Sequence, residues 1–209
     1  MAISTSMRRA ALGLRAHSGS AALVALAGSL ESPDVVIRRR IVTADAAVGG
    51  SKQPFHTAEP LELADAAAWI DKCTESTKQL SREAVRTAIS DLRGRGLEVV
   101  GCGVILGSGR SLPALEAILA SHAMLHTAEG EFYRQALVEA GKHCGLPVVG
   151  IKERDVYEQG AAHWHISVVE LRSRIAALGR GIGPPWTQDQ KYAALVGWLA
   201  LNGLKLKPA

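Results

Sequence analysis

The sequence predicts an α/β fold with a mixed sheet, and three features of the chain support this. A strand–helix–strand unit covers 97–151, an apolar hairpin lies near the start of the chain, and a long amphipathic helix joins the two. Strands joined by a helical crossover are parallel and the crossover is right-handed, whereas hairpin strands are antiparallel. We expect a frayed start over 1–10, a single domain over 11–203 and a basic tail over 204–209.

The strand–helix–strand unit is the centre of this prediction. Leu97–Leu106 is apolar on both faces and contains glycine, which indicates a central strand covered on two sides. Gly107–Ser111 then forms a turn, and a helical segment covers 113–144, with a break near Thr127, a suitable N-cap. Leu146–Ile151 is the second buried strand.

The hairpin and the long helix fill the first half of the chain. Leu12–Leu26 has the pattern of one strand, with small residues at 17–20 that allow a bend, and Val35–Val42 is its antiparallel partner. A loop over 43–60 follows. Apolar residues then recur at steps of three and four over 61–93, which predicts one amphipathic helix.

The last quarter of the chain contains two further helices. We expect a charged loop over 152–162 and a short extended piece over 163–166. Ser167 and Glu170 match a capping box at the start of the first helix. The segment 188–201 is apolar nearly all round, which predicts a buried helix.

Composition limits the function classes without choosing among them. The net charge of +4 permits an acidic partner such as nucleic acid but does not require one. The three cysteines lie far apart in sequence, which is typical of reduced thiols in a cytoplasmic protein rather than of a disulfide framework. No apolar run reaches the roughly 18 residues that a membrane helix needs, so we expect no membrane partner.

Three stretches resemble parts of a known fold. Residues 12–19 are similar to the first strand and turn of the ribonuclease H-like fold, 97–106 to its fourth strand and 188–196 to its last helix. The order of elements over 11–201 resembles this fold, and within it the Holliday-junction resolvases. The resemblance implies a mixed sheet flanked by helices. Nucleic acid, bound by Arg15, Arg38, Arg40 and Arg110, is a candidate partner, and a homodimer is a candidate assembly.

The same resemblance implies a damaged catalytic site. Nucleases of this fold hold two Mg²⁺ ions with carboxylates from the first strand, the fourth strand and the last helix, because hard cations need several oxygen ligands. Here the first position carries Arg15, the fourth strand offers Cys102 and Gly103, and only Asp189 remains. We therefore expect a catalytically degenerate domain that acts as a binding or structural module.

Two groups of residues are candidates for binding anions. The turn after the first predicted parallel strand, together with Arg15, could hold an anion on backbone N–H groups; its residues are Gly107, Gly109 and Arg110. A plain turn is the alternative. Arg38 and Arg40 share one face of a strand and could contact nucleic-acid phosphates, or could simply protect a sheet edge with charge.

A metal centre is the other candidate site. His122 and His126 are four residues apart on a helix and therefore share one face, with Glu131 just beyond them. Two imidazoles and a carboxylate could hold Zn²⁺ in a metal-dependent nuclease or other hydrolase with a rebuilt active site, and ordinary helix-face histidines are the alternative. The catalytic candidates are Asp189, Arg15 and Glu131. We expect no cofactor, with Zn²⁺ or Mg²⁺ as alternatives.

Overall fold

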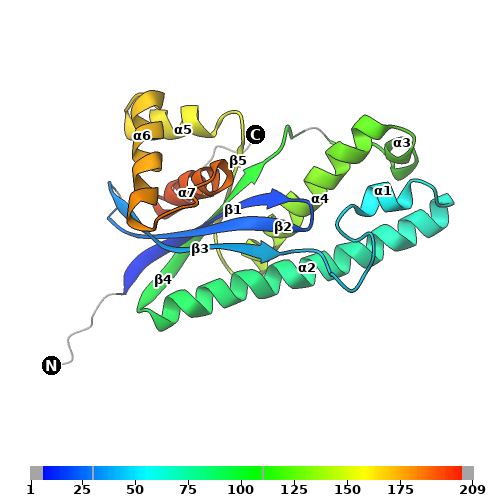
Figure 1. The fold of residues 1–209 in the computed structure, drawn as a ribbon, viewed down its shortest axis with the longest axis horizontal. Helices are drawn as coiled ribbons and strands as arrows, with labels where there is room; N and C mark the ends of the chain where they lie inside the picture. Colours follow the sequence, from blue (N-terminus) through cyan, green and yellow to red (C-terminus); the bar gives the residue numbers. More distant parts are fainter. Residues whose placement is uncertain (1–6, 30, 110, 204–209) are drawn as a thin grey trace.

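The computed structural model describes residues 7–29, 31–109 and 111–203, and a five-stranded sheet forms its centre (Figure 1). The strand order is β3-β2-β1-β4-β5. The first three strands are antiparallel neighbours, while β4 runs parallel to β1 and β5 runs parallel to β4. This order gives the mixed sheet of the ribonuclease H-like fold, as predicted. The strands are β1 (Arg8–His17), β2 (Ser20–Gly28), β3 (Pro33–Val42), β4 (Leu97–Leu106) and β5 (Val148–Lys152).

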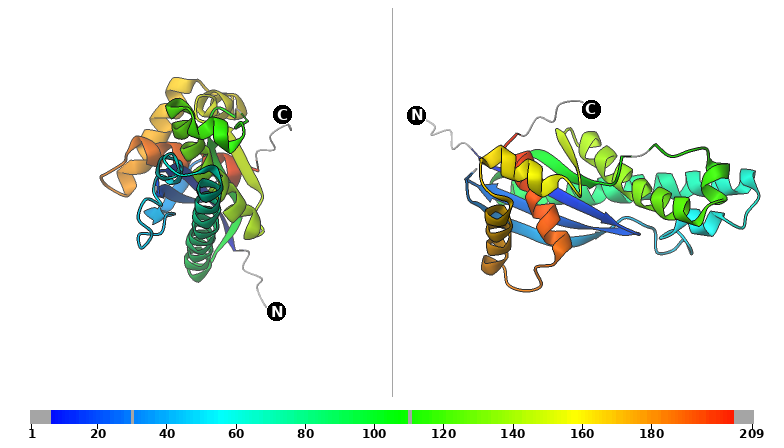
Figure 2. Two further views of the ribbon diagram at one scale, coloured as in Figure 1. Left: turned by 90° about the vertical axis from the view of Figure 1, so that its right-hand side faces the viewer. Right: turned by 90° about the horizontal axis from the view of Figure 1, so that it is seen from above.

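Helices cover both faces of the sheet and extend beyond one end of it (Figures 1 and 2). One face carries α5 (Val156–Trp164), α6 (Val168–Leu178), the 3₁₀ turn η1 (Gly179–Gly181) and α7 (Gln188–Leu201). The other face carries α2 (Leu63–Gly94) and α4 (His122–His143). The start of α2 and the start of α4 project past the sheet, where they meet α1 (Pro54–Ala58) and α3 (Leu115–Leu119).

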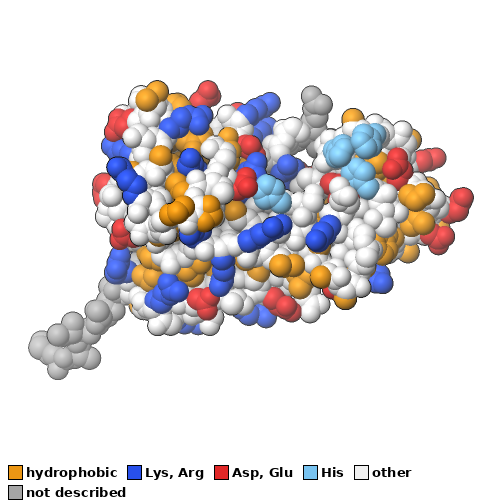
Figure 3. All heavy atoms as spheres, viewed as in Figure 1, with side chains coloured by type: hydrophobic (Ala, Val, Ile, Leu, Met, Phe, Trp, Pro, Cys, Tyr) orange, Lys and Arg blue, Asp and Glu red, His pale blue; other side chains and the backbone are white. Residues whose placement is uncertain are grey.

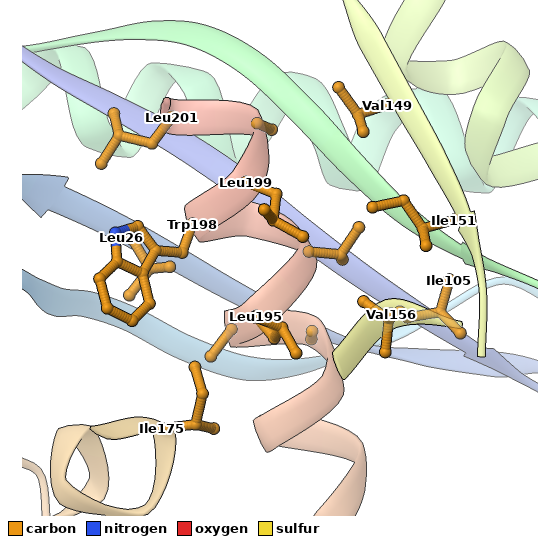
Figure 4. Packing of buried hydrophobic residues seen from close by; sticks show 14 of the residues in the cluster. Leu26, Ile105, Val149, Ile151, Val156, Ile175, Leu195, Trp198, Leu199 and Leu201 are labelled. Carbon is orange, nitrogen blue, oxygen red and sulfur yellow. The ribbon is translucent and has the colours of Figure 1, made fainter. Parts of the chain in front are cut away.

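The hydrophobic core consequently has two halves, one on each side of the sheet. Successive residues of β1 alternate between them: Ala11 packs with α7, while Leu12 and Leu14 pack on the α2 and α4 side. Figure 4 shows the first half, where leucines of α7 and Trp198 lie among residues from the strands and from α6. Each fully buried leucine contributes about 2 kcal/mol to the free energy of folding. The buried leucines of α7 therefore contribute strongly to the packing of this helix on the sheet.

Two glycines bring α7 unusually close to the strands. Gly13 of β1 and Gly103 of β4 are register partners. A Cβ on Gly13 would lie 1.8 Å from the carbonyl oxygen of Ala193, and one on Gly103 would lie 2.2 Å from that of Val196. Only glycine fits at such an approach. Because Arg15 is two residues after Gly13 and faces the same side, it reaches the first turn of α7.

The N-terminal strands differ from the prediction in two ways. The segment expected as one bent strand, Leu12–Leu26, is two strands joined at Ser18 and Gly19, where the positive φ of Gly19 (+71°) permits a tight hairpin. β1 begins at Arg8, within the stretch that was expected to be a frayed start, and residues 1–6 lie outside the described residues. The basic tail over 204–209 lies outside the described residues.

Three helical predictions also need correction. The segment 152–166 contains α5, because Val156, Tyr157 and Ala161 bury one helical face in the α7 half of the core; the expected extended piece was wrong. The break in the 113–144 segment falls at Ala120 and Ser121 rather than near Thr127. The loop over 43–60 contains the short helix α1. Among the described residues, no helix has the length and apolar character needed to cross a membrane.

Candidate functional site

Arg15 stands at the centre of an ion-pair network at the end of β1. Its two terminal nitrogens contact Asp189 Oδ1 at 2.5 Å and Glu153 Oε2 at 3.0 Å. Nε2 of His17 lies 2.9 Å from Asp189 Oδ2, and the guanidinium lies 5.5 Å from the centre of the Tyr192 ring. The network therefore joins β1, the segment after β5 and the first turn of α7.

This arrangement neutralises the carboxylates that remain at the end of the sheet. Arg15 stands where the resemblance implies an acid, and Asp189 and Glu153 both point to it instead of toward a shared cation. Glu98 is exposed at the other end of β4, and Cys102 is fully buried. The guanidinium of Arg15 therefore lies between two carboxylates and forms an ion pair with each of them.

A second group of polar side chains lies at the end of the molecule that projects past the sheet. His56 of α1 meets His122 and His126 of α4, and one ring nitrogen of each lies within 4.8 Å of the others. Nε2 of His122 and Nε2 of His126 are 3.1 Å apart. Figure 3 shows histidine side chains gathered on the surface at this end of the molecule. We call His56, His122 and His126 the three-histidine cluster.

Glu129 positions His56 in this cluster. Its Oε1 accepts hydrogen bonds from the backbone N–H groups of Phe55 (2.9 Å) and His56 (3.2 Å) and lies 3.1 Å from Nδ1 of the His56 ring. The carboxylate thus satisfies two donors at the start of α1 and docks that helix on α4. Burial raises the pKa of the Glu129 carboxyl, and the hydrogen bonds from His56 and Phe55 oppose this rise.

The cluster has the donor set of a zinc site. With Nδ1 of His56 bound to Glu129, its Nε2 is buried and has no hydrogen-bond partner among the described residues. Two nitrogens held about 2.1 Å from Zn²⁺ at the tetrahedral angle are about 3.4 Å apart, which compares with 3.1 Å between His122 and His126 and with at most 4.8 Å within the whole cluster. A carboxylate behind a ligating histidine is the usual outer partner in such sites.

A cavity of about 260 Å³ connects the network to the cluster. Arg15 and His17 line it from β1, and His126, Glu129 and Arg134 line it from α4. His122 and His126 are exposed, whereas His56 is half-buried behind them. A metal ion on the cluster would therefore have its remaining coordination position open to solvent and to this cavity.

The structure separates several residues that the sequence grouped together. Glu131 lies 3.6 Å from Arg134 and is not part of the three-histidine cluster, in which His56 stands beside His122 and His126. Arg38 donates to the carbonyl oxygens of Gly183 and Pro185 and so anchors the segment before α7. Arg40 is exposed on β3.

The predicted anion-binding turn is described only in part, because Arg110 lies outside the described residues. Gly107 and Gly109 belong to an irregular segment after β4, beside Arg134 and Lys152 respectively. Arg15 does not join this turn in an anion site, since its terminal nitrogens contact Asp189 and Glu153. No motif in the sequence pointed to Glu153, which directly follows the short strand β5.

The fold and the site together define a ribonuclease H-like α/β domain with a three-histidine cluster beside the Arg15 ion-pair network. No family model matches the chain, and no curated protein matches its sequence. Among solved structures it is similar to Thermus thermophilus RuvC in complex with a Holliday-junction substrate, with 14% identity over 92% of both chains and a TM-score of 0.48. A second Thermus thermophilus RuvC structure has 13% identity over 90% of this chain and 91% of that chain (TM-score 0.45). An Aquifex aeolicus member of the Ppx/GppA family has 18% identity over 74% of this chain and 39% of its own (TM-score 0.34).

Proposed function

We propose that this chain is a zinc-dependent hydrolase built on a catalytically degenerate ribonuclease H-like domain. The observation that carries the proposal is the convergence of His56, His122 and His126, with Nδ1 of His56 already fixed by Glu129. Three protein ligands and one open position are the pattern of catalytic zinc sites, whereas structural sites have four protein ligands.

The chemistry follows from this ligand set. Zn²⁺ on three neutral imidazoles keeps most of its charge and lowers the pKa of a bound water to about 7, which supplies hydroxide near neutral pH. His122 and His126 are exposed, so a substrate can reach that position. The Arg15 network also favours zinc over a pair of Mg²⁺ ions. Arg15 pairs with Asp189 and Glu153, so at this site the described residues leave no group of free carboxylates.

Hydrolysis of activated esters with and without zinc tests this function. Protein loaded with one equivalent of Zn²⁺ is expected to hydrolyse a substrate from a panel that contains p-nitrophenyl acetate and p-nitrophenyl phosphate esters. A chelator is expected to abolish this hydrolysis. His126→Gln should lower kcat/KM at least 100-fold, while His143→Gln, an exposed histidine at the far end of the same helix, should not. A rate that survives in His126→Gln, or no zinc-dependent rate on any substrate, would contradict the proposal.

A second candidate is a non-catalytic binding or structural module, acting on nucleic acid or as a homodimer. It is favoured by Arg40, which is exposed and for which the described part of the chain shows no ion pair. Arg40 also lines a cavity of about 300 Å³ with Arg39 and His17, next to the Arg15 network. Fluorescence anisotropy with single-stranded and branched DNA tests this candidate: binding should weaken steeply between 50 and 200 mM salt and in Arg40→Gln. No binding at low salt would remove it.

A further inference from the structure

One stripe along α4 continues from the three-histidine cluster toward the sheet. His122, His126, Gly130 and Arg134 are spaced by four residues and so share a helix face. The Arg134 side chain extends back along this stripe: a Cβ on Gly130 would lie 2.8 Å from its Nη1. The missing side chain of Gly130 therefore provides the space that the guanidinium fills, one helical turn from His126.

The end of β4 encloses the same guanidinium from the opposite side. A Cβ on Gly107 would lie 2.6 Å from Nη1 of Arg134. The carboxylate contact of Arg134 is with Glu131 at 3.6 Å, which is too long for a hydrogen bond. The two glycines thus leave room for the guanidinium between two backbone segments. Among the described residues, its N–H groups have few hydrogen-bond acceptors.

Donor side chains predominate in the lining of the cavity beside Arg134. Arg15, His17 and His126 line it together with Arg134. The described lining residues include one carboxylate, Glu129, whose Oε1 accepts hydrogen bonds from His56 and from the start of α1, while its buried Oε2 has no hydrogen-bond partner among the described residues. Because Arg15 and His17 already contact Asp189, Arg134 is the lining cation that is left to bind an anion.

We infer that this cavity binds the phosphoryl group of a phosphate-ester substrate, with the Arg134 guanidinium on its oxygens and the scissile bond facing the three-histidine cluster. Guanidinium groups bind phosphate through paired, charge-assisted hydrogen bonds, and a turn of α-helix, about 5.4 Å, is a separation that one phosphoryl group can span between a metal and an arginine. The inference rests on the proposed zinc centre and adds the class of its substrate.

The reaction balances without a further reactant. The oxygen of one water bonds to phosphorus, the P–O bond to the leaving alcohol breaks, and the alcohol takes one of the water's protons. A cavity of about 260 Å³ accommodates one phosphate ester with a small substituent. The phosphoryl group could be the terminal group of a mononucleotide or an internal group of a nucleic acid, and the chemistry is shared by both.

Calorimetric titration of zinc-loaded protein with inorganic phosphate tests the inference. Zinc content is measured first in every variant, so that loss of the metal is distinguished from loss of the anion site. Arg134→Gln and Gly130→Ala are both expected to keep their zinc and to bind phosphate at least 10-fold more weakly. Gly130→Ala displaces the guanidinium without removing it. Arg154→Gln, an arginine whose side chain is 72% exposed and lies outside the cavity, is the matched control.

Two outcomes overturn this inference alone: zinc-loaded protein that does not bind phosphate, or Arg134→Gln that binds it with unchanged affinity. Absence of bound zinc overturns the proposed function and this inference with it. Turnover assays with a 5′-mononucleotide and with a short single strand that lacks terminal phosphates distinguish the two sources. Zinc-dependent release of phosphate from the mononucleotide, or zinc-dependent cleavage of the single strand, supports the phosphoryl site. The absence of both products would contradict it.

Discussion

Nδ1 of His56 lies 3.1 Å from Oε1 of Glu129, and this contact organises the whole projecting end of the molecule. The same oxygen accepts the backbone N–H groups of Phe55 and His56, so it fixes both the helix α1 and the histidine on it. Because Nδ1 lies against Glu129, Nε2 is the nitrogen of the His56 ring that is left for a further partner, and it has none among the described residues.

Replacing this carboxylate tests its role in orienting the ligand. Glu129→Gln is expected to weaken zinc binding 10- to 100-fold, because an amide holds the His56 ring less firmly and makes its Nε2 less basic. Competition against a fluorescent chelator measures the affinity. Glu139→Gln on the same helix, at a half-exposed carboxylate, is the control. Equal affinities for the two variants would mean that Glu129 only docks α1.

The Arg15 network predicts that one substitution can restore a magnesium site. Arg15→Asp would place a third carboxylate beside Asp189 and Glu153, the number that a Mg²⁺ site of this fold requires. At 10 mM Mg²⁺, a dissociation constant near 1 mM would raise the free energy of unfolding by about 1.4 kcal/mol. Thermal unfolding with and without Mg²⁺ measures this shift. We expect none for the original chain, and a shift there would count against the neutralised site.

Because α7 lies so close to the sheet, we expect a single methyl group added at Gly13 to lower the stability of the protein strongly. Gly13→Ala is expected to lower the free energy of unfolding by about 3 kcal/mol or more, because its Cβ would meet the carbonyl oxygen of Ala193 at 1.8 Å. Gly49→Ala is the matched control, since no atom lies within 4 Å of the Cβ it adds. Urea unfolding of both variants gives the comparison, and similar midpoints would refute the described packing of α7.

We expect the buried thiol of Cys102 to make the free energy of unfolding depend on pH above pH 9. Burial, with a smaller contribution from Cys144, raises the pKa of this thiol from 9.0 to about 12. The unfolded chain therefore loses its proton first as the pH rises, so the stability present below pH 9 is lost progressively toward pH 12. The loss attributable to Cys102 should be on the order of 1 kcal/mol at pH 10.

Comparison of the original chain with Cys102→Ala isolates this effect. The substitution leaves a small cavity whose cost does not depend on pH. The difference in the free energy of unfolding between the two proteins should therefore shrink as the pH rises from 8 to 10. A difference that stays constant over this range would show that Cys102 does not titrate as its burial requires.

The sheet and its buried helix could be predicted because their signals are local. Leu97–Leu106 is apolar on both faces and 188–201 is apolar all round, and most residues of both elements are buried in the structure. The hairpin turn at Gly19 was missed because small residues allow both a bend and a reversal. The helix α5 was missed because its apolar face spans only two turns among charged residues.

The candidate site could be predicted only where its residues share one element. The i, i+4 spacing identified His122 and His126, since both lie on α4. The third histidine of the cluster, His56, comes from a short helix within a predicted loop, more than sixty positions away, and the docking of α1 on Glu129 brings it there. Glu131 was chosen for its proximity in sequence, but the helix carries it toward Arg134 instead.

The zinc content of the purified chain tests the central claim most directly. Metal-free protein is dialysed against equimolar Zn²⁺, passed through a desalting column and analysed by mass spectrometry of the elements. We expect one zinc per chain for the original sequence and for His143→Gln, and less than a tenth of that for a variant carrying both His122→Gln and His126→Gln. Equal zinc in all three, or none in the original chain, would contradict the account.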